Sequence, residues 1–198
     1  MLVAGLTMMF SFMGAQFIQP KQVTENVPGV TTPINKTENP ISRILLYSLG
    51  VLSLGISASP IFSLMPEIDP SIIPSSIGIT MGIFGGASLM AYNMPKDKML
   101  GYGRIYMGSL LGLIGMQLIG LGSAIFLGPN PLSTLLFQID NYVGIVLFAG
   151  LIGYDTHLAI KQYETGNADH LGMSIQMLLD FWNLLIRIME IMAKSKRK

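Results

Sequence analysis

Two aspartates stand inside the last two apolar stretches of the chain. Asp155 lies in Gly-Tyr-Asp-Thr within residues 142–160, and Asp180 lies in Leu-Leu-Asp-Phe-Trp-Asn within residues 171–193. A carboxylate at membrane depth is costly, so it usually faces a partner or a water-filled cavity. Two such groups predict an ion- or proton-binding site. The alternative is a structural hydrogen bond that locks two helices together.

The second of these stretches, residues 171–193, predicts a helix with one polar face. At about 100° per residue, its polar side chains fall within a wedge of roughly 80°. Arg187 lies two turns from Asp180, so we expect it to pair within its own helix, with Glu190 or Asn183. The supporting polar face consists of Gln176, Asn183, Arg187 and Glu190, together with Asp180.

The turn at residues 163–170 is short, so the two helices that it joins should be antiparallel neighbours. Counted from Gly166 at about 1.5 Å per residue, Asp155 and Asp180 lie at a similar depth, roughly 15–20 Å away. Helix axes about 8–10 Å apart would let the carboxylates meet. Two carboxylates in a low-dielectric site tend to hold one proton between them, whereas the doubly charged pair attracts a cation such as calcium. We therefore expect a proton-operated gate with Asp155 and Asp180 as calcium ligands, and no other cofactor.

The composition indicates a membrane protein. The chain has 198 residues, of which 51% are hydrophobic and 12% charged, and a mean hydropathy of +0.55. Its apolar runs reach the length of about 20 residues that a spanning helix needs, and only helices satisfy this backbone in lipid. The sequence predicts an all-α, polytopic membrane helix bundle, a single domain in the lipid bilayer. The expected spans are residues 1–18, 42–59, 73–93, 103–127, 142–160 and 171–193, with a linker over residues 19–41.

Charge and residue counts exclude other classes of function. The formal net charge of +1 gives no basic field for nucleic acid. With no cysteine and two histidines, neither a thiolate nor a histidine metal cluster is expected. No Ser/His or Cys/His constellation suggests an enzyme. An intramembrane aspartyl protease is disfavoured because a Gly-x-Gly-Asp motif is absent.

The positive charges of the loops predict topology. Counting six spans, one side of the membrane receives most of the basic loop residues, and this side should be the cytosol or an organelle matrix. These residues are Lys21, Lys36, Arg43, Lys96, Lys98, Arg104 and Lys161. The basic tail at residues 194–198 falls on the other side. Either the tail violates the rule or the last helix does not cross fully, and we expect a full crossing.

Several of these stretches resemble one known family. The runs Ile-Gly-Tyr-Asp-Thr and Leu-Leu-Asp-Phe-Trp-Asn resemble the C-terminal signature of the transmembrane Bax-inhibitor-motif family. The loop at residues 94–100 and the run Gly-Leu-Gly-Ser-Ala-Ile-Phe-Leu-Gly-Pro look most like its mitochondrial branch, the growth-hormone-inducible transmembrane proteins. The resemblance implies six helices around a central C-terminal helix. It also implies a pH-sensitive calcium leak, or calcium/proton exchange in the mitochondrial inner membrane, with Asp155 and Asp180 at the two gating carboxylates.

The chain also departs from that family. With about six spans, the family's first helix is expected to be absent. The first span has no Lys or Arg and Arg43 begins the second, so the family's basic latch is not evident. Arg187 could substitute as counter-charge, although it lies on the same helix as Asp180. His157 replaces a usual Gln, and we expect it to make a polar contact at a helix end. An alternative function is a non-transporting accessory subunit, with partner subunits in a larger assembly such as a respiratory complex. The endoplasmic reticulum or another membrane is the alternative location.

Overall fold

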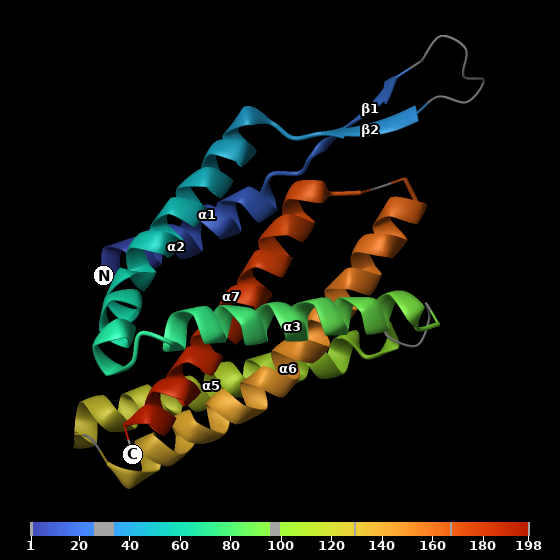
Figure 1. Ribbon diagram of the computed structural model, residues 1–198. Helices are drawn as coiled ribbons and strands as arrows, with labels where there is room; N and C mark the ends of the chain where they lie inside the picture. The colour runs from blue at the N-terminus through green and yellow to red at the C-terminus, as the bar shows by residue number, and fades with distance from the viewer. Residues whose placement is uncertain (1, 26–33, 96–99, 129, 167, 198) are drawn as a thin grey trace. The chain divides into compact units, whose positions relative to one another are not determined.

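The computed structural model describes residues 2–25, 34–95, 100–128, 130–166 and 168–197. These residues form six helices and one two-stranded sheet (Figure 1). The helical membrane fold predicted from the sequence is confirmed. The elements are α1 (Leu2–Phe17), β1 (Lys21–Glu25), β2 (Ile34–Glu38), α2 (Ile41–Ile68), α3 (Ile72–Asn93), α5 (Gly103–Leu127), α6 (Pro131–Glu164) and α7 (His170–Lys196).

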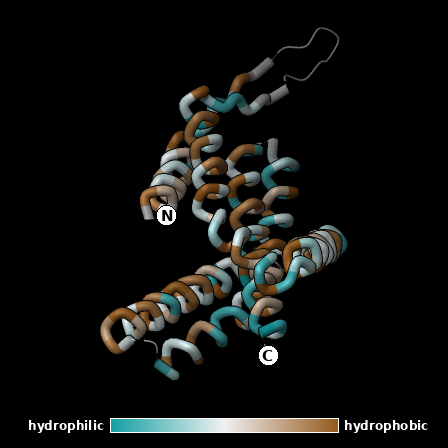
Figure 2. Tube along the Cα trace, turned by 60° about the vertical axis from the view of Figure 1, so that its left-hand side comes forward, coloured by the Kyte–Doolittle hydropathy of each residue, from teal (hydrophilic) through white to brown (hydrophobic). Residues whose placement is uncertain are grey.

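Four of the described helices, α2, α3, α5 and α6, are long and apolar enough to cross a membrane. Hydrophobic residues follow the helices over most of their length (Figure 2). Helix α1 is apolar but has 16 residues. Helix α7 is long enough at 27 residues, but its polar and charged side chains make it too polar to count among the helices able to cross a membrane. The hydropathy of α7 therefore does not support the full crossing expected for residues 171–193.

Helix α6 begins at Pro131, well before the predicted start at residue 142. Asn130 caps it, since its Oδ1 accepts the Ser133 N–H at 2.8 Å, and Pro131 occupies the first turn, where its missing N–H costs nothing. Asp140 and Asn141, which precede the predicted span, are buried inside the helix. Their partners come from α5 and α7, so local sequence did not disclose that the helix continues through them.

Helix α2 also exceeds its predicted end near Pro60 and continues to Ile68. A proline removes one helical hydrogen bond, but in an apolar run the remaining backbone groups are still best satisfied by continuing the helix. The Ser63 hydroxyl donates to the Pro60 carbonyl at 3.0 Å and supports the turn that follows. By contrast, α3 and α5 coincide closely with the expected spans.

The expected linker over residues 19–41 contains a β-hairpin. Strands β1 and β2 are antiparallel, with Lys21 opposite Glu38 and Gln22 opposite Thr37. Residues 26–33 of the expected linker lie outside the described residues. Composition did not reveal that the two strands pair, because the pairing joins residues 21–25 to residues 34–38.

The chain divides into two compact units. Unit 1 comprises Met1–Leu64 and Leu158–Leu178. In this unit α1 lies beside α2 (Figure 1). The rings of Phe12 and Tyr47 are 6.3 Å apart, and a side chain at Gly50 would overlap the Phe12 ring. The small residue on α2 thus admits the aromatic residue of α1.

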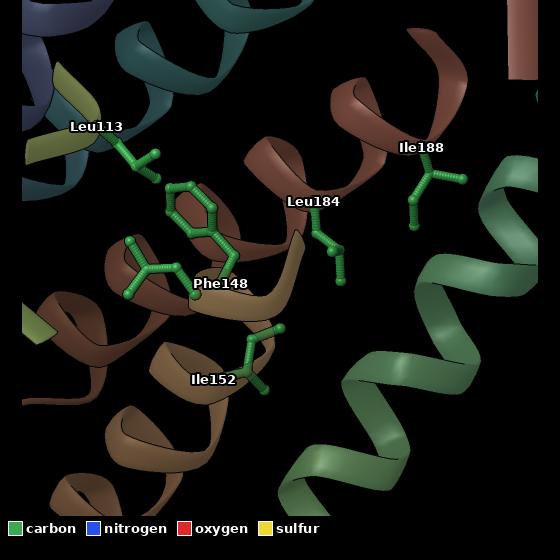
Figure 3. Close-up of a cluster of buried hydrophobic side chains, with 6 residues drawn as sticks. Leu113, Phe148, Ile152, Leu184 and Ile188 are labelled. Carbon is green, nitrogen blue, oxygen red and sulfur yellow. The ribbon is translucent and has the colours of Figure 1, made fainter. Parts of the chain in front are cut away.

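Unit 2 comprises Met65–His157 and Leu179–Lys198. Its core joins α5, α6 and α7 (Figure 3). The buried members are Leu113, Leu147, Phe148, Ile152, Leu184 and Ile188. Helix α3 adds further contacts, among them a Ser76 hydroxyl 3.3 Å from the Met192 sulfur. Within unit 2, the C-terminal part of α7 therefore packs against three other helices.

Candidate functional site

The two aspartates singled out from the sequence meet in unit 2. Asp155 on α6 and Asp180 on α7 bring their carboxyl groups within hydrogen-bonding reach of each other. Asp180 is 7% exposed, and its Oδ2 has no hydrogen-bond partner among the described residues. Two carboxyl groups form a favourable contact only when a proton lies between them, because two negative charges at this distance repel. The pair can therefore hold a proton or, when deprotonated, a cation.

Side chains next to the pair anchor it to α3. Thr156 donates to the Ile152 carbonyl at 2.7 Å and lies 3.2 Å from the Ser88 hydroxyl of α3. Phe181 meets Phe84 of α3 edge to face, with ring centroids 5.9 Å apart. These contacts hold the residues beside Asp155 and Asp180 in place.

A tyrosine pair joins α5 to α6 one residue before Asp155. The rings of Tyr106 and Tyr154 have centroids 5.7 Å apart. A side chain at Gly103 would overlap Tyr154, and one at Gly150 would overlap Tyr106. These glycines therefore bring the two helices close enough for the rings to reach each other.

The other members of the predicted polar face go to separate partners. Arg187 forms a buried ion pair with Asp140 of α6, and Glu190 accepts from the Asn141 amide at 2.8 Å. Asn183 donates to the Leu179 carbonyl of its own helix. Gln176 lies in unit 1 and is half-buried. The predicted pairing of Arg187 with Glu190 or Asn183 is wrong, because the long guanidinium side chain reaches across to α6 instead.

The Asp140–Arg187 pair is the second charge centre on these two helices. Arg187 Nη1 donates to Asp140 Oδ2 at 2.6 Å and to the Asp140 backbone carbonyl at 2.5 Å. Gln117 of α5 donates to the same carboxylate at 3.1 Å, and the Arg187 guanidinium lies 5.3 Å from the Phe148 ring centre. Because its partner is Asp140, Arg187 is not the counter-charge of Asp180 that the sequence suggested.

Metal binding at the carboxyl pair would need donors other than protein acids. The described residues include no group of three or more His, Asp or Glu side chains able to hold a metal ion. Asp155 and Asp180 supply two carboxylates, and calcium takes six to eight oxygen ligands, including water. The pair therefore suits a transient, largely hydrated cation better than a resident one.

A protein-family model matches nearly the whole chain. The model described as "Inhibitor of apoptosis-promoting Bax1" matches residues 1–197. The chain belongs to the Bax1-I family. The resemblance drawn from the two aspartate motifs is thereby confirmed at the level of the family.

Similar curated proteins carry the Bax inhibitor name. The chain is 32% identical over 143 residues to Bax inhibitor 1 of Homo sapiens, covering 72% of this chain and 57% of that protein. It is 29% identical to the Bos taurus protein over the same length and shares. It is 27% identical over 158 residues to the Arabidopsis thaliana protein, covering 77% of this chain and 59% of the other. The chain thus spans less than two thirds of the length of these relatives. No solved structure matches the chain.

Sequence reasoning about this Bax1-I chain missed Asp140. An acid inside an apolar helix is a candidate functional residue, and this rule applies to Asp140 as well. Asp140 was assigned to a loop because the predicted fifth span begins at residue 142. A helix start drawn from the Asn130-Pro131 cap would have placed Asp140 inside the helix.

A second buried ion pair, in unit 1, was also missed. Arg43 is 1% exposed, and its guanidinium bonds Asp169 through both Nη atoms, at 2.6 and 2.5 Å, and the Ala15 carbonyl at 2.8 Å. Asp169 also caps α7, accepting the Gly172 N–H at 3.0 Å. Desolvation works to raise the pKa of Asp169, but the hydrogen bonds from Arg43 and Gly172 outweigh it and hold that pKa below its usual range. Arg43 therefore ties the α6–α7 turn to α1 and α2.

His157 is 3% exposed, and neither ring nitrogen has a hydrogen-bond partner within the described ranges. The expected polar contact at a helix end is therefore not found. Its side chain is buried although it lies near the end of the apolar part of α6, so position along the helix did not predict its surroundings.

Proposed function

We propose that this Bax1-I protein is a pH-controlled calcium pathway, either a leak or a calcium/proton exchanger, operated by Asp155 and Asp180. The observation that carries the proposal is the contact between these two carboxyl groups on neighbouring helices. The burial of Asp180 and its unpartnered Oδ2 add to it. A shared proton closes the pair, and loss of that proton leaves two negative charges that repel each other and attract a divalent cation.

The chemistry of the surroundings favours transport over catalysis. A carboxyl pair has no nucleophile or histidine base in contact with it among the described contacts, so proton and cation exchange is the reaction that it can support. The protein would act as a passage rather than an enzyme. The ions themselves are the substrates.

The resemblance to the growth-hormone-inducible branch supports a location in the mitochondrial inner membrane. That branch is suggested by residues 94–100 and 120–129. Fractionation of cells that express the tagged chain, with markers for the inner membrane and the endoplasmic reticulum, tests this part of the proposal. Enrichment with the endoplasmic reticulum marker would reject it.

The test of function is calcium flux into proteoliposomes across a range of pH. The wild-type protein should conduct calcium with a steep pH dependence, and Asp180→Asn should flatten that dependence because Asp155 then has no second carboxylate with which to share a proton or hold a cation. Asp155→Asn should act in the same direction. Glu67→Gln is the matched control, since Glu67 is an exposed acid at the end of α2.

Two outcomes would reject the proposal. One is an equal pH response in wild type and Asp180→Asn. The other is the absence of calcium flux from well-folded wild type at any pH, together with recovery only in a large assembly after mild detergent extraction. The latter result would favour the alternative function, an accessory subunit of a membrane complex.

A further inference from the structure

The Asp140–Arg187 pair shares both of its helices with the proposed carboxyl gate. Arg187 follows Asp180 by seven residues on α7, which corresponds to about 10 Å along the helix. Asp140 lies on α6, the helix that carries Asp155. A cation that leaves the gate along α6 and α7 toward the C-terminal end of α7 would therefore meet this second charge centre.

Around Asp140, the structure collects the kind of oxygen atoms that bind a divalent cation. Its carboxylate and its backbone carbonyl both face the same point, and that point is taken by Arg187 Nη1. Glu190 stands close by, bonded to Asn141, the neighbour of Asp140. Carboxylate, carbonyl and amide oxygens are the ligands that calcium prefers. The guanidinium thus occupies the place that a free cation would take.

A glycine makes room for this arrangement. A Cβ at Gly144 would overlap the Arg187 guanidinium. Gly144 lies one turn after Asp140, so the absence of its side chain also leaves the Asp140 carbonyl open to Arg187. Arg187 is 5% exposed, and its Nε has no partner among the described residues. Its position therefore depends on Asp140, the Gly144 gap and the Phe148 ring.

We infer that Arg187 is a tethered cation that occupies a second calcium site at Asp140 and so controls which ions pass the α6–α7 seam. While Arg187 is bonded to Asp140, the centre is neutral and a free divalent ion gains nothing by stopping there. This role rests on the proposed function. It makes Arg187 and Asp140 specificity-determining residues, distinct from the gate.

The inference predicts opposite effects for the two partners. Arg187→Gln leaves the Asp140 carboxylate without its tethered cation, so calcium binding should tighten and calcium flux should rise, each by at least about five-fold. Asp140→Asn leaves a buried positive charge, which should reduce calcium flux by at least about five-fold. The double variant removes both charges and should return flux to within about two-fold of wild type.

Two measurements separate this inference from the gate. Equilibrium binding of 45Ca to detergent-solubilised protein reports the second site even when no flux occurs. Calcium flux in proteoliposomes, recorded for each variant with and without Asp180→Asn, reports the pathway. Flux that depends on Asp180 but not on the charge at position 187 would retain the proposed function and overturn this inference.

A purely structural pair would behave differently. Both single variants would then change flux in the same direction, and the double variant would not restore it, which would overturn the inference. If Arg187→Gln does not yield a monodisperse protein, Asp140→Asn and the double variant still decide, because only a tethered cation predicts that the flux lost in Asp140→Asn returns in the double variant. A double variant that conducts no better than Asp140→Asn would overturn the inference.

Discussion

Helices α6 and α7 meet at two charged places that differ in kind. At one, Asp155 and Asp180 bring two like groups together, and a proton is needed to reconcile them. At the other, Asp140 and Arg187 form a buried pair of opposite charges, to which the Gln117 amide also donates. The second place is already neutral, whereas the first holds two groups of like charge. Under the proposed function, one pair of helices thus carries both a fixed contact and a contact that pH can change.

The largest expected effect follows from removing one partner of the neutral pair. Asp140→Leu should destabilise the protein by about 3–5 kcal/mol, because it leaves the Arg187 charge buried and uncompensated. Asp180→Asn should change stability by about 1 kcal/mol or less, since an amide still bonds the Asp155 carboxyl. Thermal unfolding in detergent measures both. Equal losses for the two variants would contradict the distinction between a fixed and a changeable contact.

A smaller loss of stability is expected from filling the space at Gly144, next to the Arg187 guanidinium. Gly144→Ala should cost about 1–3 kcal/mol, because the new methyl group displaces Arg187 from Asp140. Gly122→Ala on α5 is the matched control, since a Cβ there meets nothing within 4 Å. The measurement is again thermal unfolding. A control that loses as much stability as Gly144→Ala would show that the cost is not specific to Arg187.

The ion pair in unit 1 extends the comparison to a partly exposed acid. The pKa of Asp169 is lowered in the folded protein, so its contribution to stability is complete well above the ordinary value of 3.8 and is lost as pH falls through the native pKa. Asp169→Asn should cost about 1 kcal/mol near neutral pH, a figure discounted for solvent screening. The difference from wild type should shrink below about pH 4. Unfolding curves at several pH values test this, and a difference that grows in acid would refute it.

The smallest effect is expected at the surface. Lys196 lies 2.9 Å from Asp69, whose pKa is lowered by the Ser71 hydroxyl first and by Lys196 second. Lys196→Ala should leave the unfolding temperature unchanged within error, because exposed ion pairs contribute little. A measurable loss would mean that this contact anchors the end of α7. The Asp69–Lys196 pair would then stabilise the protein as the buried ion pairs do.

Much of this arrangement was readable before the structure. Long apolar runs with almost no charge predicted a helical membrane protein, and the intramembrane aspartates were visible as isolated acids in those runs. The short turn between the last two helices predicted that Asp155 and Asp180 lie at a similar depth. The family resemblance rested on the same motifs. These inferences succeeded because they depend on local composition and on the fixed rise of a helix.

The partners of Arg187 and Arg43 could not be read in this way. Each arginine contacts an aspartate far along the chain, Asp140 in one case and Asp169 in the other. A guanidinium can reach several residues from its own backbone, so its partner depends on which helices pack together and which glycine leaves room. Periodicity places a polar side chain on a face of its helix. Packing in three dimensions selects the group that it bonds.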